Sequence, residues 1–199
     1  MKDGVKPALR VPMTASYWLG VVTNSSKANF DKYPELGKQY QTMISKIVEE
    51  FTGMGAVVIL DLHWSDDVNE QQVMPLKAKS DTGGAVEFWD SVSAMFKDND
   101  HVFYELYNEP HNNATDLYLH GNDTYTGMLD MIAAVRKNTQ DGVLVVAGGT
   151  GWAYDADSLI ALEGQTTEEL MMYNFHPYMG PNQAGDSKKS ADGFEAMVK

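Results

Sequence analysis

The sequence predicts an α/β fold built on a parallel sheet, and three observations lead to this prediction. Five short apolar runs follow one another along the 199 residues, with helix-like segments between them. The runs are continuously hydrophobic rather than alternating, which indicates strands that are covered on both faces. Polar and aromatic residues gather where the runs end. Two architectures fit these features, an open doubly wound sheet or part of a (β/α)8 barrel.

The predicted elements can be placed along the chain in order. The expected strands cover residues 8–11, 56–63, 101–107, 143–147 and 170–175. Between them, residues 40–51, 86–96 and 125–135 carry apolar side chains at the three- and four-residue spacing of an amphipathic helix. No strand is followed by a Gly-x-Gly-x-x-Gly turn, and the glycine-rich run 148–151 leads into Trp-Ala-Tyr rather than Lys-Ser/Thr. This argues against a doubly wound sheet that binds a nucleotide.

Composition excludes several classes of partner and chemistry. The formal net charge of −13 repels phosphate backbones, so we expect no nucleic-acid partner. No stretch of 18 consecutive apolar residues occurs, so we expect no membrane partner either. With no cysteine, disulfides and thiolate metal sites are excluded. Neutral polymers such as polysaccharides remain as partners.

Polar groups stand at or just past the carboxyl ends of the predicted strands. They are Arg10, His63, Asn108, Glu109, His176 and Tyr178. The ends of parallel barrel strands share one face, and that face holds the active site of such a barrel. A single histidine after a strand is more often structural, but strands need no such series of polar endings in order to fold. The series therefore predicts an active site.

Four segments give this series a family resemblance. They are Leu9-Arg10-Val11-Pro12, Ile59-Leu60-Asp61-Leu62-His63, Leu106-Tyr107-Asn108-Glu109-Pro110-His111 and Phe175-His176-Pro177-Tyr178. In this order and strand context, the sequence resembles glycoside hydrolase family 5, the cellulase-type retaining glycosidases. The resemblance implies a (β/α)8 TIM barrel, present here as a partial barrel of about the second to the sixth strand. It also implies that residues 1–199 are one catalytic-domain fragment without a cofactor or a metal.

The resemblance also implies a role for each polar residue. Glu109 would be the general acid/base, and Asn108 would bind the 2-hydroxyl of the sugar at the cleavage point. Arg10 and Tyr178 would hold the nucleophile carboxylate. His63 and His176 are similar to the two histidines that line the subsite of that sugar. A retaining enzyme places its second carboxylate about 5 Å from the acid, where it attacks the anomeric carbon.

Other residues are assigned by their position. Trp152 and Trp64 are expected to be sugar-stacking platforms, and Trp18 is a weaker candidate for the same role. We expect Trp89, which has helix-face spacing, to lie in the core. Glu105 lies inside a predicted strand and should be buried or point into the barrel. Asp61 shares a face of its strand with His63 and could support that histidine.

The nucleophile is expected to be missing from this chain. Nine residues precede Arg10 and 21 follow Tyr178, which leaves no room for the first, seventh and eighth barrel strands. The remaining candidates precede a strand or begin a helix; they are Glu163, Glu168, Glu169 and Glu195. We therefore expect no substantial hydrolase activity from these 199 residues alone. Open edges of the partial barrel should favour self-association.

Several alternatives remain. The chain could be a non-catalytic carbohydrate-binding fragment or a pseudoenzyme, or the parent could act on β-mannan or β-1,3-glucan instead of β-1,4-glucan. A metal-dependent hydrolase would use His63, His176 and Asp61, but no His-x-His stands on a strand. The family implies a secreted, extracellular parent, although residues 1–7 lack the apolar core of a signal peptide.

Overall fold

A computed structural model describes residues 6–24, 26–65, 72–78, 83–111, 114–139, 143–167 and 170–176. Its strands are β1 (Ala8–Thr14), β2 (Val57–Trp64), β3 (Val102–Glu105), β4 (Val145–Gly148) and β5 (Met171–Asn174). Its helices are α1 (Ala15–Leu19), α2 (Lys27–Lys32), α3 (Leu36–Gly53), α4 (Ala85–Phe96), α5 (Thr115–His120), α6 (Met128–Arg136), α7 (Thr150–Ala153) and α8 (Ala156–Glu163).

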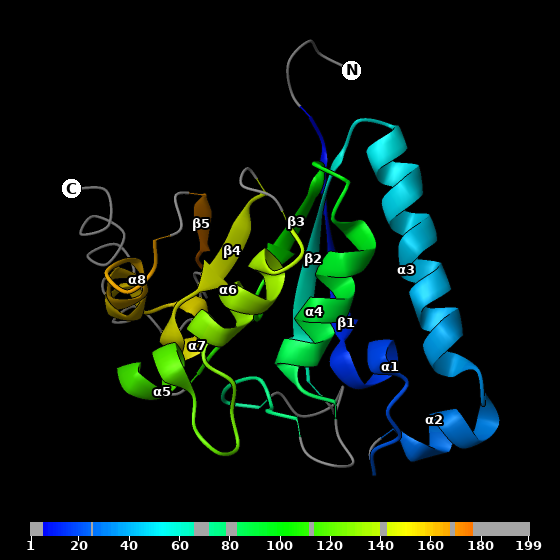
Figure 1. The fold of residues 1–199 in the computed structure, drawn as a ribbon, viewed down its shortest axis with the longest axis horizontal. Coiled ribbons are helices and arrows are strands. Elements are labelled where there is room, and N and C mark those ends of the chain that lie inside the picture. Colours follow the sequence, from blue (N-terminus) through cyan, green and yellow to red (C-terminus); the bar gives the residue numbers. More distant parts are fainter. Residues whose placement is uncertain are drawn as a thin grey trace, which may run out of the picture.

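The strands form one sheet in chain order, β1-β2-β3-β4-β5, and every neighbouring pair is parallel. Helices connect each strand to the next. Figure 1 shows α4 and α6 lying across the sheet, with α3 along the β1 side and α8 beside β5. The five predicted strands and the α/β class are confirmed.

The hydrophobic core lies between the sheet and the helices. Val58, Leu60 and Leu62 of β2 are fully buried there, together with apolar side chains of α3, α4 and α6. Alternation along the strand turns the residues between them, including Asp61, to the opposite face. That face carries the polar groups discussed below. Complete burial of each large apolar side chain contributes about 1.5–3 kcal/mol.

Two tryptophans belong to this core. Trp89 is fully buried, as predicted, and its indole N–H donates to the carbonyl oxygen of Leu106 at 3.1 Å. Trp18 is also fully buried and donates to the hydroxyl of Ser91 at 3.0 Å. The expectation that Trp18 could be a sugar platform is therefore wrong, because its ring has no exposed face.

Most elements differ from the prediction at one or both ends, and contacts account for the differences at β1, β3 and α6. β1 continues to Thr14 because it stays in register with β2 from Ala8 to Met13. β3 ends at Glu105 instead of residue 107, although the backbone N–H of Leu106 still donates to β4. α6 begins at Met128, because the preceding segment forms an antiparallel bridge at Tyr125. None of the described helices is long and apolar enough to cross a membrane.

Candidate active site

The structure places most of the predicted site residues at the carboxyl edge of the sheet. His63 is the penultimate residue of β2, and Asn108 and Glu109 follow β3 by three and four residues. His176 follows β5 by two residues. Asn108 is held at the sheet because its backbone N–H donates to the carbonyl oxygen of Leu62, at 3.1 Å. Tyr178 lies outside the described residues.

Arg10 was expected at the end of a strand, but it lies in the first half of β1. The prediction was wrong because four further residues of this strand continue to pair with β2. The long side chain of Arg10 nevertheless reaches the polar edge, where its Nη2 donates to Oδ1 of Asn108 at 2.6 Å. Arg10 therefore belongs to the cluster despite its position in the strand.

Glu109 and His176 form a direct pair. Oε1 of Glu109 lies 2.7 Å from Nδ1 of His176, and the two side chains are 13% and 24% exposed. This carboxyl group is therefore largely shielded from water but still reachable from the edge of the sheet. A hydrogen bond of this length fixes the orientation of the carboxyl group.

An ionic cluster lies beside this pair, in which the carboxylates are buried and the side chain of Arg10 is 35% exposed. The guanidinium of Arg10 donates through Nε and Nη2 to the two carboxylate oxygens of Glu105, at 2.6 and 2.8 Å. Its Nη2 also lies 3.0 Å from Oδ2 of Asp61. Nδ2 of Asn174 donates to Oε1 of Glu105. Glu105 was expected to be buried or inside the barrel, and its 2% exposure confirms burial.

Burial and neighbouring charged groups act in opposite directions on the pKa values of this cluster. Burial disfavours the charged guanidinium, but the hydrogen bond to Glu105 and the neighbouring negative charges outweigh it and raise the pKa of Arg10. Burial, reinforced by the charge of Glu105, raises the pKa of Asp61 to about 6, although its hydrogen bond to His63 acts against the rise. One cation thus lies between two buried acids.

His63 is oriented by Asp61, as its position on the strand suggested. Its Nδ1 lies 2.6 Å from Oδ2 of Asp61. Its ring also packs against the indole of Trp64, with the ring centres 4.0 Å apart. Such a carboxylate contact fixes the orientation of the imidazole through one of its two nitrogens.

Trp152 lies in the short element α7 after β4 and is 52% exposed. Its indole stacks on the imidazole of His111, with ring centres 4.9 Å apart and planes inclined by 10°. His111 follows Glu109 by two residues, so the exposed indole is placed next to the segment that carries Glu109. The geometry is compatible with the platform predicted for Trp152.

Sequence reasoning missed the roles of Glu105, Asn174 and His111. A charged residue in the middle of an otherwise apolar strand needs a buried partner, and Arg10 in β1 was available to Glu105. Asn174 ends β5 in the same way that other polar residues end their strands. No sequence pattern indicated the stacking of His111 on Trp152.

The described residues contain no group of three or more His, Asp or Glu side chains arranged to hold a metal ion. The three ligands of the metal-dependent alternative are divided between two separate contacts. His63 pairs with Asp61, whereas His176 pairs with Glu109. The ligand set of that alternative is therefore not assembled.

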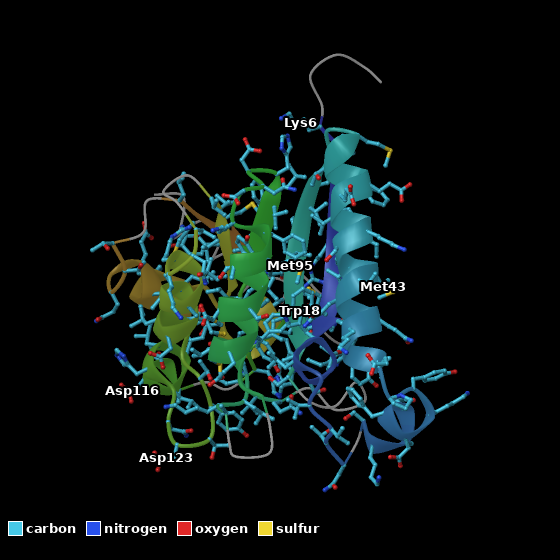
Figure 2. All side chains as sticks on the ribbon, turned by 45° about the vertical axis from the view of Figure 1, so that its right-hand side comes forward. Lys6, Trp18, Met43, Met95, Asp116 and Asp123 are labelled. Atoms are coloured by element: carbon cyan, nitrogen blue, oxygen red, sulfur yellow. The ribbon has the colours of Figure 1, made fainter. Side chains whose placement is uncertain are left out.

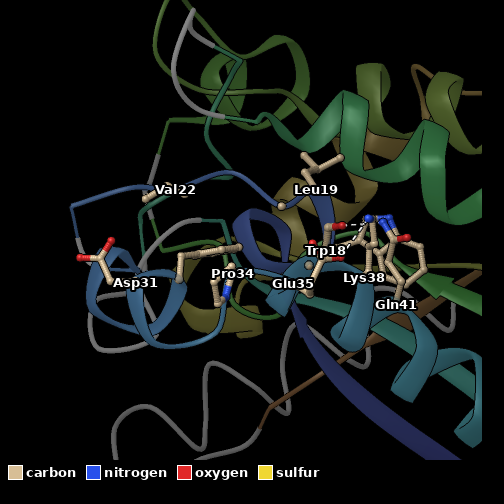
Figure 3. Close-up of a pocket in the computed structure, with 11 residues that line it drawn as sticks. Trp18, Leu19, Val22, Asp31, Pro34, Glu35, Lys38 and Gln41 are labelled. Atoms are coloured by element: carbon tan, nitrogen blue, oxygen red, sulfur yellow. Dashed lines mark hydrogen bonds and ion pairs between the residues drawn. The ribbon is translucent and has the colours of Figure 1, made fainter.

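A cavity of about 410 Å³ lies elsewhere, between the α1–α2 connection and α3 (Figure 3). Trp18 is among the residues that line it, as are Glu35 and Lys38, which form an exposed ion pair with Oε2 and Nζ 2.9 Å apart. None of the residues of the polar cluster lines it.

The fold and the cluster define a class of protein. A parallel sheet covered by helices, with polar side chains at the carboxyl edge, fits a part of a TIM barrel with its active-site face. The chain belongs to the cellulase family, glycosyl hydrolase family 5, whose model matches residues 3–199. The family resemblance drawn from the four sequence segments is thereby confirmed.

Characterised relatives agree with this assignment. Over 172 residues, the chain is 27% identical to endoglucanase A of Butyrivibrio fibrisolvens, covering 84% of this chain and 36% of the relative. Over 139 residues, it is 30% identical to endoglucanase A of Evansella cellulosilytica, covering 69% and 25%. The chain thus spans between a quarter and two-fifths of the length of these two relatives.

Solved structures show the same fold. Cel5A of Hypocrea jecorina matches with a TM-score of 0.64 at 16% identity, over 90% of this chain and 52% of that one. XacCel5A in complex with cellopentaose matches with a TM-score of 0.65 at 17% identity, over 96% and 63%. The prediction of a partial TIM barrel is confirmed by these neighbours.

Proposed function

We propose that the chain is a piece of the catalytic domain of a retaining endoglucanase that cleaves β-1,4-glucan, and that Glu109 is its general acid/base. The single observation that carries this proposal is the pairing of Glu109 with His176 at the carboxyl edge of the sheet. The relatives that are named endoglucanases support the substrate class. The parent protein would be extracellular, where polysaccharides are found.

The proposed chemistry follows from the contacts of each group. Glu109 would protonate the leaving oxygen of the glycosidic bond and later accept a proton from the attacking water. Asn108 would bind the sugar 2-hydroxyl, with its side-chain oxygen fixed by Arg10. A hydrogen bond to that hydroxyl strengthens in an oxocarbenium-like transition state. His63 and His176 would border the same sugar, with Trp64 behind His63.

A retaining mechanism also needs a nucleophile, and we propose that these 199 residues do not supply one. Asp61 and Glu105 are the carboxylates that the described structure places against Arg10, and both are almost completely buried. A buried carboxylate engaged by a guanidinium is poorly placed to reach an anomeric carbon. Arg10, with Tyr178, would instead orient a carboxylate from another part of the parent protein.

Because the acid and the nucleophile are assigned to different parts of the parent protein, the proposal can be tested on the isolated chain. The purified 199-residue chain should release no reducing sugar from carboxymethylcellulose above a blank, because the covalent step has no nucleophile. Isothermal titration with cellopentaose should nevertheless detect binding. Turnover comparable to that of the parent enzyme would refute the missing nucleophile, and absence of both binding and turnover would refute the proposed glucan site.

The role of Glu109 is tested in the parent protein. Glu109→Gln should lower kcat on carboxymethylcellulose by about 10²–10⁴-fold, since general acid–base catalysis contributes on this order. Binding of cellopentaose should persist. Glu49→Gln on the exposed side of α3 is the matched control and should leave activity unchanged. Parallel assays on β-mannan and β-1,3-glucan separate the alternative substrates within the family.

Non-catalytic glucan binding is the second candidate for the isolated chain. The half-exposed indole of Trp152, already stacked on His111, favours it because a fixed aromatic ring can bind a pyranose face without any chemistry. In this case cellopentaose binds and no turnover appears in the parent either.

A further inference from the structure

An unusual backbone conformation occurs directly after β4. Gly151, Trp152 and Ala153 have φ angles of 63°, 62° and 58°, which lie in the left-handed region. Trp152 and Ala153 are the non-glycine residues with positive φ in the described structure. L-residues avoid this region because Cβ approaches the following carbonyl oxygen. Two such residues in succession persist only where surrounding contacts enforce the conformation.

Local hydrogen bonds enforce it here. The N–H of Ala153 donates to the carbonyl oxygen of Gly149 at 3.1 Å, and the N–H of Asp155 donates to that of Thr150 at 3.0 Å. The hydroxyl of Thr150 donates to Oδ2 of Asp155, also at 3.0 Å. Gly149 has no space for a side chain, since a Cβ there would lie 2.0 Å from the carbonyl oxygen of Asp155. The turn is therefore held on both sides.

The turn is bonded to His176 and to Pro110, the residue that follows Glu109. The N–H of Trp152 donates to the carbonyl oxygen of Pro110, the residue after Glu109, at 2.8 Å. The carbonyl oxygen of Ala153 accepts from the N–H of His176 at 3.0 Å. Two adjacent left-handed residues thus hold the backbone of Pro110, next to the acid, on one side and the backbone of His176 on the other.

The same turn sets the orientation of the exposed indole. His111 covers one face of the Trp152 ring at a plane angle of 10°. Ala153, only 1% exposed, anchors the turn in the protein interior. The same short segment of backbone therefore contacts His176 and the residue next to Glu109, and it carries the aromatic ring.

We propose that the left-handed turn Gly151–Ala153 is a positioning element of the site, and that Ala153 is the positioning residue that brings His176 to Glu109. This inference rests on the proposed function of Glu109 for its catalytic meaning. The contacts that the turn makes do not depend on that function. Relaxing the turn should separate Glu109 from His176 and release Trp152 from its fixed orientation.

The test measures the ring nitrogens of His176 by ¹⁵N-NMR of the 199-residue chain, without sugar. Ala153→Val places a β-branched residue where positive φ is strongly disfavoured. Gly151→Val does the same at a site with open space, because its Cβ would lie 3.8 Å from the nearest side-chain atom. Ala153→Gly permits the left-handed backbone and is the conservative variant. Ala161→Val in α8 is the matched control for added volume at a partly buried alanine.

Both valine variants at the turn should shift the Nδ1 resonance of His176 away from its hydrogen-bonded position, whereas Ala153→Gly and Ala161→Val should leave it unchanged. If Ala153→Val does not fold, Gly151→Val decides alone. An unchanged Nδ1 resonance in a folded turn variant overturns the proposal. Cellopentaose titration of the unsubstituted chain tests the proposed function separately, so the two failures are distinguishable.

Discussion

Arg10 and Glu105 form a bidentate pair although they lie on β1 and β3, with β2 between them. The two donor–acceptor distances are 2.6 and 2.8 Å, and the carboxylate is 2% exposed. Asp61 on β2, the strand between them, contributes a second carboxylate at 3.0 Å from Nη2 of Arg10. One guanidinium therefore compensates two buried acids, and its removal should have large effects.

Replacing Arg10 by methionine should destabilise the chain by about 3–5 kcal/mol, because it leaves two buried carboxylates without a cation. The measurement is urea unfolding of the wild type and the variant at pH 7. Lys137→Met is the matched control, since it breaks an exposed ion pair with Asp90 and should change the unfolding free energy little. Equal effects of the two substitutions would contradict the importance of the buried cluster.

The raised pKa of Asp61 predicts a specific pH dependence of stability. Its folded pKa is about 6, against an ordinary value of 3.8. Above pH 6 the carboxylate is charged in both states, and burial of the charge destabilises the folded state by about 3 kcal/mol at roughly 1.4 kcal/mol per pKa unit. Below about pH 4 the group is protonated in both states, and this cost disappears.

The contribution of Asp61 to stability should therefore rise as the pH falls from 6 to 4. Asp61→Asn has no titrating group, so the wild type should gain up to about 3 kcal/mol relative to this variant over that interval. Urea unfolding of both proteins at half-unit pH steps measures the difference. Parallel curves for the two proteins would show that Asp61 does not titrate in this range.

The hydroxyl of Tyr104 gives a third prediction. It is buried and has no hydrogen-bond partner among the described residues, and burial raises the pKa of this phenol. A buried hydroxyl without a partner costs about 1–3 kcal/mol. Tyr104→Phe should therefore leave stability unchanged or raise it by about 1 kcal/mol, as measured by thermal or urea unfolding.

Tyr118→Phe is the control for this experiment. The hydroxyl of Tyr118 is also buried, but it donates to the carbonyl oxygen of Gly148 at 3.0 Å. Its removal should lower stability by about 1 kcal/mol, since a buried acceptor loses its partner. A loss of the same size from both substitutions would indicate that Tyr104 has a partner after all.

Trp152 and Met43 are similarly exposed, at 52% and 48%, but lie at different places. Met43 lies on the outer side of α3, as Figure 2 shows. Trp152→Ala should weaken cellopentaose binding by about tenfold, equivalent to about 1.4 kcal/mol, because a sugar face loses its aromatic contact. Met43→Ala should leave binding unchanged in the same calorimetric titration. Equal affinities of both variants would place the glucan away from Trp152.

The strands could be predicted because each is a continuous apolar run with its own boundary. The long helices α3, α4 and α6 were found in the same way, through periodicity over several turns. Short helices such as α1, α2 and α7 have four to six residues, which is too short for a repeating apolar face. Their existence depends on the loops around them and could not be obtained from local patterns.

The polar edge of the site was also predictable, since Asn108, Glu109, His63 and His176 all occur next to strand ends. The partners of these residues were harder to predict. Contacts such as those of Glu105 with Arg10 depend on which strands are neighbours and on how side chains cross over the strand between them. The left-handed turn at Trp152 depends on tertiary contacts, because neither tryptophan nor alanine favours positive φ.

The ionic cluster has a consequence for how the strands find their alignment. Arg10, Asp61 and Glu105 come from three successive strands, and each must point to the same face for the charges to meet. A slip of one residue in β1 would turn Arg10 outward and put Leu9 or Val11 against two buried acids. Misaligned sheets would thus carry a heavy electrostatic penalty that the correct one avoids. The cluster beside the proposed acid would in this way also select the correct strand register during folding.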